Sequence, residues 1–360
     1  MKTMRIGNRR VGEGEPVFII AEAGVNHNGD VVLAKKLIEA AKAASADAVK
    51  FQTFDADELA TSDAPMAAYQ ERNTGRVQTQ REMLAGLTLS DDEFVALAAH
   101  ARKIGITFLS TPHGGFKSVD LLEKLDVPAY KIGSADLNNL PLLDYVARTK
   151  KPILISTGMA TMDGIAEAVR TIRRAGNEKI VILQCTTDYP CPPDHANVEA
   201  MRTIANKFRL PVGFSDHTVG SDASFTATAL GACVIEKHLT LDRSLKGPDH
   251  TASADPEEFE RFIDRIRSVR TILGSGNKRP LPSEKVFMPT VLKSVVAAQH
   301  IRKGMVITND MLAIKRPAKG LPPKYYWQLL GTRASRDIPQ DGYFTQRDLK
   351  RSRAKSRKNV

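Results

Sequence analysis

The sequence predicts an α/β fold, a (β/α)8 TIM barrel followed by a small mixed α+β domain, and three observations predict it. Short apolar runs rich in Val, Ile and Leu recur eight times through the first 275 residues. Segments of helical period alternate with these runs, and continuous apolar strands belong to sheets covered on both faces. Eight such units in about 260 residues fit a closed barrel better than an open doubly wound sheet. After residue 275 the composition changes, which predicts a second domain.

The apolar runs define the barrel strands in chain order. We predict strands at 17–24, 47–54, 106–111, 129–134, 152–157, 179–186, 211–216 and 233–240. The first helix is predicted after Asp30, because Leu33, Leu37, Ala40 and Ala44 fall on one helical stripe. The barrel domain therefore covers residues 1–275.

Two further helix starts carry capping signals. Ser90 with Glu93 forms a capping box, and Asp255 followed by Pro256 has the order favoured at a helix start. About forty residues separate the second strand from the start at Ser90, and connections of such length are usually functional. We expect this connection to form a lid over the site.

The remainder of the chain is predicted as a linker, a small domain and a tail. Residues 276–290 are rich in Gly, Pro and Lys, as in a linker, and residues 291–350 contain a weak repeat. The positions Ile301, Ile307, Thr308 and Leu312 recur at identical spacing as Ile338, Phe344, Thr345 and Leu349. A unit of about sixty residues is marginal alone, so we expect it to dock on the barrel or on a second subunit.

Composition and charge narrow the classes of protein. The chain has no apolar run of the roughly 18 to 20 residues that a membrane span needs, and its N-terminus lacks the apolar centre of a signal peptide. We therefore expect a cytoplasmic protein with no membrane partner. Six of the basic residues behind the net charge of +11 lie in the last eleven positions, so the basic tail 351–360 is expected to be a disordered extension. No nucleic-acid partner is predicted. The positive net charge that remains without the tail suits a small anionic substrate.

The three cysteines are sparse and lack metal-binding spacing. Cys185, Cys191 and Cys233 are predicted to be free thiols rather than disulfide or zinc ligands, with Cys185 a small core residue.

Every predicted strand ends in polar side chains. In a barrel, the carboxyl ends of the strands converge on one face, where the chemistry occurs. These ends carry Glu22; Lys50 and Gln52; Ser110 and Thr111; Lys131 and Ser134; Ser156 and Thr157; Thr186 and Thr187; Ser215, Asp216 and His217; Glu236 and His238. Polar groups at the ends of all eight strands predict a site at this face.

Two kinds of chemistry are available there. His217 and His238 close adjacent strands, so their imidazoles are predicted to bind one divalent cation; manganese, magnesium, cobalt and zinc all suit such ligands. Lys50 and Lys131 would be costly to bury without an anion beside them. With the hydroxyls of Thr111, Ser134, Ser156 and Ser215, they predict a pocket for a phosphate or a carboxylate. Asp216 is expected to be an orienting or structural group.

Longer motifs add a resemblance to a known family. The stretches EAGVNHNGD from Glu22, VKFQTF from Val49, YKIGSADLNNLPLL from Tyr130, ISTGM from Ile155, LQCTTDYP from Leu183, GFSDHT from Gly213 and EKHLTLDRSLKGPDHTAS from Glu236 resemble the sialic acid synthase family. The region after residue 290, with KSVVAAQHIRKGMVITNDML and IKRPAKG, is similar to that family's antifreeze-like (SAF) domain.

The resemblance implies an activity. Members condense phosphoenolpyruvate with an open-chain N-acylated sugar aldehyde to a nine-carbon 2-keto acid and release phosphate. It implies a divalent metal on His217 and His238, usually Mn²⁺, that polarises the aldehyde oxygen. Glu22 matches the catalytic carboxylate that manages protons. The positions that match the phosphoenolpyruvate site are Lys50, Thr111, Lys131, Ser134, Ser156, Thr187, Tyr189 and Ser215.

The resemblance also assigns sugar contacts and a partner. Gln52, Asp136 and Asp249 would orient the sugar hydroxyls. Arg316, in IKRPAKG, matches an arginine that reaches the partner subunit's barrel in this family, which implies a domain-swapped homodimer.

Three positions depart from the family pattern. Asp136 stands where bacterial relatives commonly carry glutamate, which draws the carboxylate back by about one methylene. Thr187 replaces an asparagine or serine, and His113 stands where relatives more often carry an aromatic residue. The sequence leaves two roles open for His27 and Asn28, helix capping or a part in the site. It also leaves two roles open for His250, a supporting contact or a place in a polar loop.

The sugar itself stays open between N-acetylmannosamine, the N,N'-diacetyllegionaminate precursor and a 6-phosphorylated sugar. The loop APMAAYQERNTG resembles forms that use unphosphorylated sugars. More distant alternatives are another phosphoenolpyruvate-dependent aldol synthase and a non-catalytic SAF-type glycan-binding protein.

Overall fold

The computed structural model describes residues 3–75, 77–113 and 115–349. Within these, the chain divides into two compact units, one that ends at Gly274 and one that starts at Ser275. The tail predicted at 351–360 lies outside the described residues. Each unit is described by itself.

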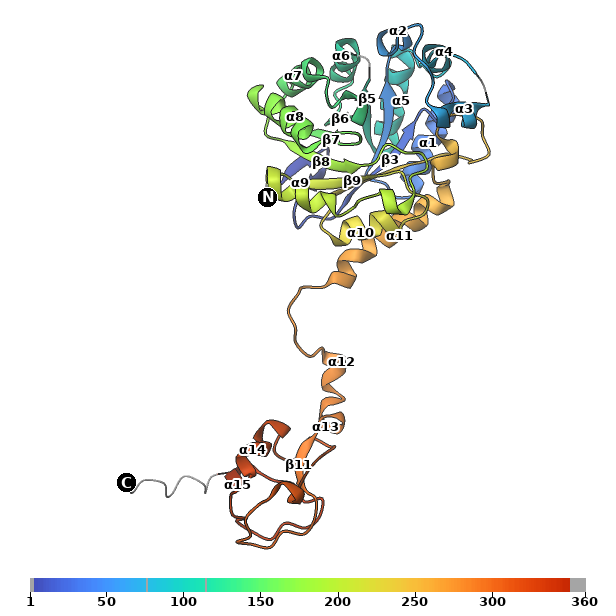
Figure 1. The fold of residues 1–360 in the computed structure, drawn as a ribbon. Helices are drawn as coiled ribbons and strands as arrows, with labels where there is room; N and C mark the ends of the chain where they lie inside the picture. Colours follow the sequence, from blue (N-terminus) through green and yellow to red (C-terminus); the bar gives the residue numbers. More distant parts are fainter. Residues whose placement is uncertain (1–2, 76, 114, 350–360) are drawn as a thin grey trace. The chain divides into compact units, whose positions relative to one another are not determined.

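The first unit is the predicted (β/α)8 barrel (Figure 1). Its parallel strands are β3 (Phe18–Gly24), β4 (Ala48–Thr53), β5 (Thr107–Pro112), β6 (Tyr130–Ile132), β7 (Ile153–Ser156), β8 (Ile180–Cys185), β9 (Val212–Asp216) and β10 (Val234–His238). They pair in the order β5-β4-β3-β10-β9-β8-β7-β6. Strands β5 and β6 are neighbours at the seam, where no ladder joins them among the described residues. All eight predicted strands are confirmed, and the barrel is nearly closed.

Helices surround the strands, and the three starts predicted after Asp30, at Ser90 and at Asp255 are confirmed. They are α1 (Val31–Ala43), α5 (Asp91–Ile104), α6 (Phe116–Lys124), α7 (Leu140–Arg148), α8 (Met162–Arg174), α9 (Ala200–Phe208), α10 (Asp222–Ala229) and α11 (Pro256–Leu273). The carboxylate of Asp30 accepts from the first-turn amides of α1, and Ser90 and Glu93 form a reciprocal capping box on α5. Asp255 caps α11, with Pro256 as its first residue.

The buried face of α1 differs from the predicted stripe. The helix buries Ala34, Leu37, Ile38 and Ala41, whereas Leu33 and Ala40 are half-buried. The i, i+3, i+4, i+7 pattern is present, but its register lies one residue later, because Ile38 and Ala41 face the strands and α5.

The barrel has two apolar layers. The larger one lies between the outer face of the strands and the helices, and the smaller one fills the barrel interior. Met4, Ile6 and Val11 belong to the interior layer, and they come from a hairpin of β1 (Met4–Ile6) and β2 (Arg9–Val11). The sequence analysis missed this hairpin, because its strands are three residues long and carry three arginines.

The long connection after β4 is folded. It contains α2 (Ala56–Leu59), α3 (Ala68–Thr74) and α4 (Gln80–Ala85). Its apolar side chains form a small core of their own, in which Met66, Met83, Leu84 and Leu87 pack with Val25, Phe54 and Ala56.

The second unit has a separate core. Its elements are α12 (Pro282–Lys285), α13 (Met288–Val291), β11 (Ser294–Ala297), β12 (Leu312–Lys315), α14 (Tyr326–Leu329) and α15 (Gln346–Leu349). Ile301 and Ile338, the first positions of the predicted repeat, form an antiparallel bridge, with both amides donating at 2.8 Å. Ile307, Leu312 and Phe344 pack in the same core, so the repeat has a structural counterpart.

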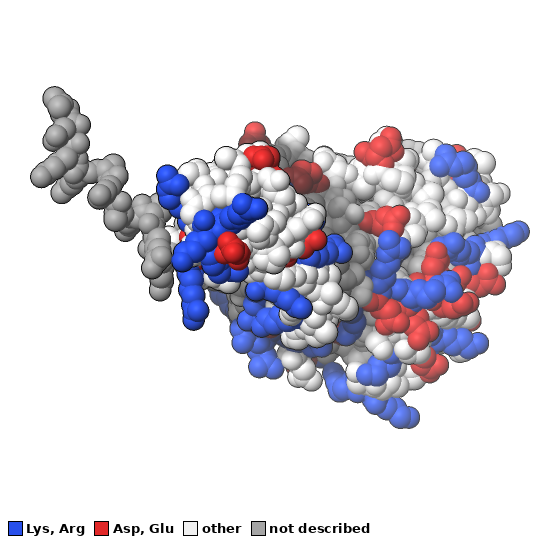
Figure 2. Space-filling view, turned by 90° about the horizontal axis from the view of Figure 1, so that it is seen from below, with Lys and Arg blue, Asp and Glu red and all other residues white. Residues whose placement is uncertain are grey.

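On the face seen in Figure 2, Lys and Arg side chains are interspersed with Asp and Glu side chains. Among the described residues, none of the helices has both the length and the apolar character needed to span a bilayer.

Candidate active site

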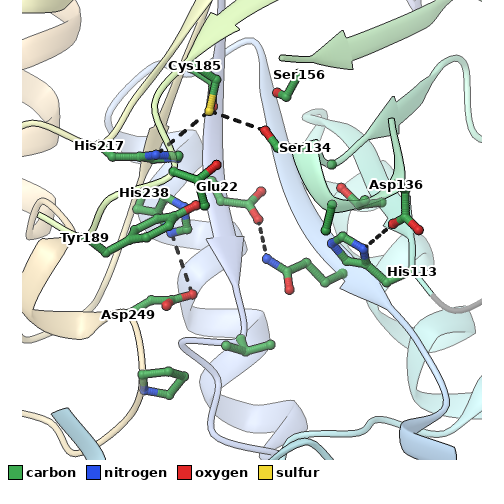
Figure 3. A pocket seen from close by; sticks show the side chains of 18 of the residues that line it. Glu22, His113, Ser134, Asp136, Ser156, Cys185, Tyr189, His217, His238 and Asp249 are labelled. Carbon is green, nitrogen blue, oxygen red and sulfur yellow. Dashed lines mark hydrogen bonds and ion pairs between the residues drawn. The ribbon is translucent and has the colours of Figure 1, made fainter. Parts of the chain in front are cut away.

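A cavity of about 440 Å³ opens at the carboxyl ends of the barrel strands. The side chains that line it converge from opposite sides of the barrel (Figure 3). The predicted site residues among them are Glu22, Lys50, Gln52, Thr111, Lys131, Ser134, Asp136, Ser156, Thr187, Tyr189, Ser215, His217, His238 and Asp249. Arg316, the remaining predicted residue, belongs to the second unit, where it follows β12 and is exposed.

Strand alternation decides which polar side chains enter the cavity. On β10, Glu236 and His238 share the inward face, whereas Lys237 lies between them and points the other way. Lys237 lies 3.3 Å from Asp216, which sits outside the cavity on β9. The structural role expected for Asp216 agrees with this placement.

The cavity floor holds two buried lysines and two buried carboxylates. The Nζ of Lys50 lies 2.5 Å from Oε2 of Glu22 and 3.8 Å from Oε2 of Glu236. The Nζ of Lys131 lies 3.3 Å from Oε1 of Glu236, which also accepts a 2.9 Å hydrogen bond from Ser215. Glu236 therefore connects the two lysines.

The electrostatics of the floor follow from burial and from these pairs. Burial raises the pKa of Glu22 above its ordinary value, although Lys50 opposes the rise. Burial also acts to raise the pKa of Glu236, but the two lysines outweigh it and lower this pKa to about 2. Burial would lower the pKa of Lys50, but Glu22 and Glu236 raise it above the ordinary value. For Lys131 burial dominates, and its pKa is lowered. The floor therefore holds a cation at Lys50 that an anionic ligand can reach.

Neutral donors surround the lysines. Thr111 accepts a 3.0 Å hydrogen bond from Lys50, and its own hydroxyl hydrogen stays available. The hydroxyl of Ser156 is buried and has no partner among the described residues. Ser134 accepts from the amide of Gly158 at 3.0 Å, and a Cβ at Gly158 would lie 2.1 Å from Oγ1 of Thr187. An unpartnered buried hydroxyl beside two ammonium groups suits an anion with several acceptor oxygens.

The two histidines lie together on the other side of the cavity. Their ring centroids are 5.4 Å apart, and the ring of Tyr189 lies 4.1 Å from His217 and 5.6 Å from His238. The Nδ1 of His217 lies 2.7 Å from the carbonyl of Thr186; since a carbonyl only accepts, Nδ1 carries a hydrogen, and Nε2 keeps its lone pair in the neutral form of the ring. Burial acts to lower the pKa of His217, but Cys185 and the Thr186 carbonyl outweigh burial and raise it above the ordinary value. The Nδ1 of His238 is buried without a hydrogen-bond partner among the described residues.

These histidines fit a divalent cation that takes few protein ligands. Burial, together with His217, lowers the pKa of His238 well below its ordinary value, so its imidazole is neutral, the form that binds metals. Within the described ranges, no group of three or more His, Cys, Asp or Glu side chains is arranged around a metal position. A cation held by this pair would leave coordination positions open to water or substrate.

Asp249 and Gly24 lie beside Glu22 and Gln52, with Asp249 also near His238. Asp249 Oδ2 lies 4.0 Å from Nδ1 of His238, and burial together with Glu22 raises the pKa of Asp249 to about 6. Gln52 donates to Glu22 at 3.0 Å. Gly24 has a φ of 52°, and a Cβ there would lie 3.2 Å from Glu22, 3.4 Å from Gln52 and 3.7 Å from Asp249. Only glycine keeps this space open.

A hydrogen-bond chain outside the cavity holds the loop that carries Asp249. The Nε2 of His250 lies 3.2 Å from Oδ1 of Asn28, and its Nδ1 lies 2.7 Å from the hydroxyl of Thr240. Asn28 also donates to the carbonyl of Lys246 at 3.0 Å. His250 and Asn28 are therefore supporting contacts, and His27 accepts the amide of Gly29 within its own turn.

Cys185, expected to be a core residue, is buried but lines the cavity, with its Sγ 3.9 Å from Nδ1 of His217. Sequence reasoning also gave no role to Glu236 and to one wall of the site. Glu236 was recognised only as a polar strand end, although its spacing of two from His238 places both on the inward face. One wall is apolar, formed by Val25, Leu59, Met83, Leu84 and Leu87, mostly from the connection after β4. The sequence feature that could have indicated this wall was the length of that connection.

The fold and the cavity define a TIM-barrel protein in which two buried lysines and a pair of histidines line one cavity. Comparisons with known proteins are more specific. The NeuB family model matches residues 37–278, and the SAF domain model matches residues 293–350. The chain therefore belongs to the NeuB family and carries a C-terminal SAF domain, as the resemblance predicted.

Relatives of the chain and a solved structure support the same family. The N,N'-diacetyllegionaminic acid synthase of Legionella pneumophila is 43% identical over 91% of this chain and 93% of its own length. The N-acetylneuraminate-9-phosphate synthase of Mus musculus is 37% identical over 92% of each chain. A structure of N-acetylneuraminic acid (sialic acid) synthetase from Leptospira borgpetersenii in complex with citrate superimposes with a TM-score of 0.70 at 33% identity, over 79% of this chain and 94% of that one.

Proposed function

We propose that this protein is a nonulosonate synthase of the sialic acid type, which condenses phosphoenolpyruvate with an open-chain N-acylated sugar and releases phosphate. The observation that carries the proposal is that two buried lysines and two adjacent histidines open on one cavity. Relatives that cover more than nine-tenths of the chain are named as synthases of such acids.

The anion site suits phosphoenolpyruvate. Lys50 and Lys131 provide two ammonium groups for its phosphate and carboxylate, and Ser156 provides a buried hydroxyl without a protein partner. An anion that takes Lys50 competes directly with Glu22 for this ammonium. Glu22 is then placed to hold or transfer a proton beside the reacting carbons.

The histidine pair suits a divalent cation, and we propose Mn²⁺ as its occupant, with Mg²⁺ or Co²⁺ as alternatives. When bound, such a cation acts as a Lewis acid on the sugar aldehyde oxygen. The hydrogen bond from His217 to the Thr186 carbonyl fixes the ring so that Nε2 faces the ligand. Tyr189 packs on both imidazoles and keeps them from turning.

The side chains that line the cavity also favour some sugar substrates over others. N-acetylmannosamine is the first candidate, and the N,N'-diacetyllegionaminate precursor is the second. The apolar wall of Val25, Leu59, Met83 and Leu87 favours the second, because that sugar carries an additional acyl methyl and a 6-deoxy methyl group. Among the described lining residues, Lys50 and Lys131 are the only lysines or arginines, which disfavours a phosphorylated sugar.

We also propose that the working unit is a domain-swapped homodimer in the cytoplasm. Arg316 is exposed in the second unit, as an arginine that serves a partner's site would be. Val286 and Phe287, beside α12 and α13, are 73% and 64% exposed, which suits a surface that a second subunit covers.

Phosphate release from phosphoenolpyruvate tests the proposal. The protein is incubated with Mn²⁺ and a panel of N-acetylmannosamine, its 6-phosphate, the legionaminate precursor, a pentose phosphate and a tetrose phosphate. We expect release with an unphosphorylated N-acylated sugar. Release only with the pentose or tetrose phosphate would assign the other class of aldol synthase, and no release with any sugar would favour a binding protein.

A further inference from the structure

Two of the positions that depart from the family pattern are in contact. The Nδ1 of His113 lies 2.6 Å from Oδ2 of Asp136, and both side chains line the cavity. Their side chains keep 16% and 12% of their exposure, so the pair is accessible to a ligand of the cavity. The resemblance assigns Asp136 to the sugar, whereas His113 has no function in the roles proposed for the lysines, the histidine pair and Glu22.

The backbone holds the pair in a fixed place. His113 directly follows β5, and Asp136 ends the 3-10 turn Ser134–Asp136 after β6, so the contact spans the seam of the barrel. The imidazole of His113 lies against Gly133, where a Cβ would lie 2.6 Å from Cε1 of the ring. A side chain at Gly133 would displace the imidazole, so this glycine provides its seat.

The chemistry of the pair is defined by its hydrogen bond. A carboxylate oxygen only accepts, so Nδ1 of His113 carries the hydrogen, and Nε2 and the second carboxylate oxygen can serve a ligand. Figure 3 shows the pair across the cavity from His217 and His238, on the far side of Glu22. A ligand bound to the pair lies across the cavity from the histidines proposed to hold the cation.

We propose that His113, through its hydrogen bond to Asp136, forms with this sugar-facing carboxylate one unit that recognises neutral hydroxyl or N-acylamino groups and thereby determines which sugar is accepted. The inference rests on the proposed function. Hydroxyl and amide N–H groups donate to the carboxylate, and a hydroxyl can also bond to the imidazole. A phosphoryl group at the same place would face the charge of Asp136 and be disfavoured.

Steady-state kinetics with His113→Phe, Asp136→Asn and the double variant test the unit. Loss of a hydrogen bond to a charged group corresponds to a decrease of about 10-fold or more, so each single variant should lower kcat/KM for the sugar by at least that factor. The KM for phosphoenolpyruvate should stay within about 2-fold, because the hydrogen bonds and ion pairs of Lys50 and Lys131 with described side chains do not involve this pair. The double variant should be no more than about 3-fold worse than either single variant, because the two residues act together.

A matched control uses a pair of the same kind outside the cavity. His100 lies 3.0 Å from Glu39 on the outer helices, and His100→Phe should leave both KM values within about 2-fold. Asp136→Asn should also shift the kcat/KM ratio of N-acetylmannosamine 6-phosphate to N-acetylmannosamine upward by about 5-fold. Thermal melting confirms that each variant folds, and His113→Asn replaces His113→Phe if the larger ring does not.

Three results would overturn the inference. They are unchanged sugar kinetics, equal losses for phosphoenolpyruvate and sugar, or single effects that multiply in the double variant. If the wild type turns over no sugar of the panel, the proposed function fails by itself. Calorimetric binding of reduced, open-chain N-acetylmannosamine to wild type and His113→Phe then decides, and equal binding or no binding to both would overturn the inference.

Discussion

The Nζ of Lys50 lies 2.5 Å from Oε2 of Glu22 at the floor of the cavity, and the two side chains keep 3% and 2% of their exposure. The free protein therefore holds the ammonium proposed to bind phosphate and the candidate proton carrier in one ion pair. Glu236, 3.8 Å away, is the second carboxylate that balances the lysine. A ligand anion has to compete with Glu22 for Lys50, so binding and proton transfer share one group.

Glu22→Gln and Lys50→Met are expected to separate these roles. Gln at position 22 removes the charge but keeps the shape, so kcat should fall by at least about 100-fold while phosphoenolpyruvate binding persists or tightens. Met at position 50 removes the ammonium and should weaken phosphoenolpyruvate binding by about 100-fold or more. Calorimetric binding and initial rates measure the two effects. Weaker phosphoenolpyruvate binding in Glu22→Gln would contradict the competition.

Gly24→Ala is expected to crowd Glu22 and Gln52 and to disturb their positions in the cavity. The new Cβ would lie 3.2 Å from Glu22 and 3.4 Å from Gln52, so kcat/KM should fall by at least about 10-fold. The left-handed backbone adds a stability cost of about 1–2 kcal/mol. Gly105→Ala is the control, because Gly105 is also left-handed but caps α5 away from the cavity. Equal activity in both variants, each compared as folded protein, would refute the role of Gly24.

The sequence allowed the prediction of the barrel and of most of its cavity for one reason. Strands buried on both faces are continuous apolar runs, and the residue that ends such a run lies at the mouth of the barrel. Glu22, Lys50 and His238 could be placed in this way without knowledge of any contact.

Contacts between distant segments could not be predicted. Asn28 and His250 are 222 positions apart, and nothing in either segment indicates that they meet. The same holds for His113 and Asp136, which were noticed separately. The hairpin that contains Ile6 was missed because strands of three residues give no periodic signal.

Acidification is expected to destabilise the metal-free protein from about pH 6.5 downward. Burial lowers the pKa of His27 and of His250 to about 4, so the unfolded chain binds these two protons at higher pH than the folded one. Asp249 has the opposite sign: its pKa is raised to about 6, so its proton stabilises the fold as the pH falls through 6. The lowered pKa of His238 makes acid destabilise the fold, and the raised pKa of Glu22 makes acid stabilise it, so these two groups have opposite effects.

Over His27, His250 and Asp249, two groups of one sign and one of the other, the net effect is a difference of about one proton between pH 6 and pH 5. The free energy of unfolding should therefore fall by about 1.4 kcal/mol for each pH unit in this window. Urea unfolding at several pH values measures the slope. His250→Gln removes one of the two histidines and should bring the slope close to zero; an unchanged slope in this variant would contradict the assignment.

Metal removal is expected to abolish turnover without abolishing the anion site. Treatment with a chelator should reduce phosphate release by at least about 100-fold, and Mn²⁺ should restore it. His217→Gln and His238→Gln should each weaken the binding of Mn²⁺ alone, measured by paramagnetic resonance, while phosphoenolpyruvate binding stays within about 3-fold because Lys50 and Lys131 are unchanged. Full activity after chelation would show that the histidine pair serves another purpose.

Asp216→Asn is expected to destabilise the barrel although Asp216 lies outside the cavity. The buried carboxylate accepts from the amide and hydroxyl of Thr218 at 2.8 and 2.7 Å, from Ser224 at 2.5 Å, and pairs with Lys237 at 3.3 Å. Loss of the charge leaves Lys237 buried without a counter-ion, which costs about 3–5 kcal/mol.

Asp222→Asn provides the matched control, because Asp222 pairs with Arg265 at 2.8 Å with 87% of its side chain exposed. An exposed pair of this kind contributes less than about 1 kcal/mol. Urea unfolding at neutral pH separates the two variants. If Asp216→Asn unfolds at the wild-type midpoint, the buried pair is not what holds β9 and β10 in the positions that bring His217 and His238 together.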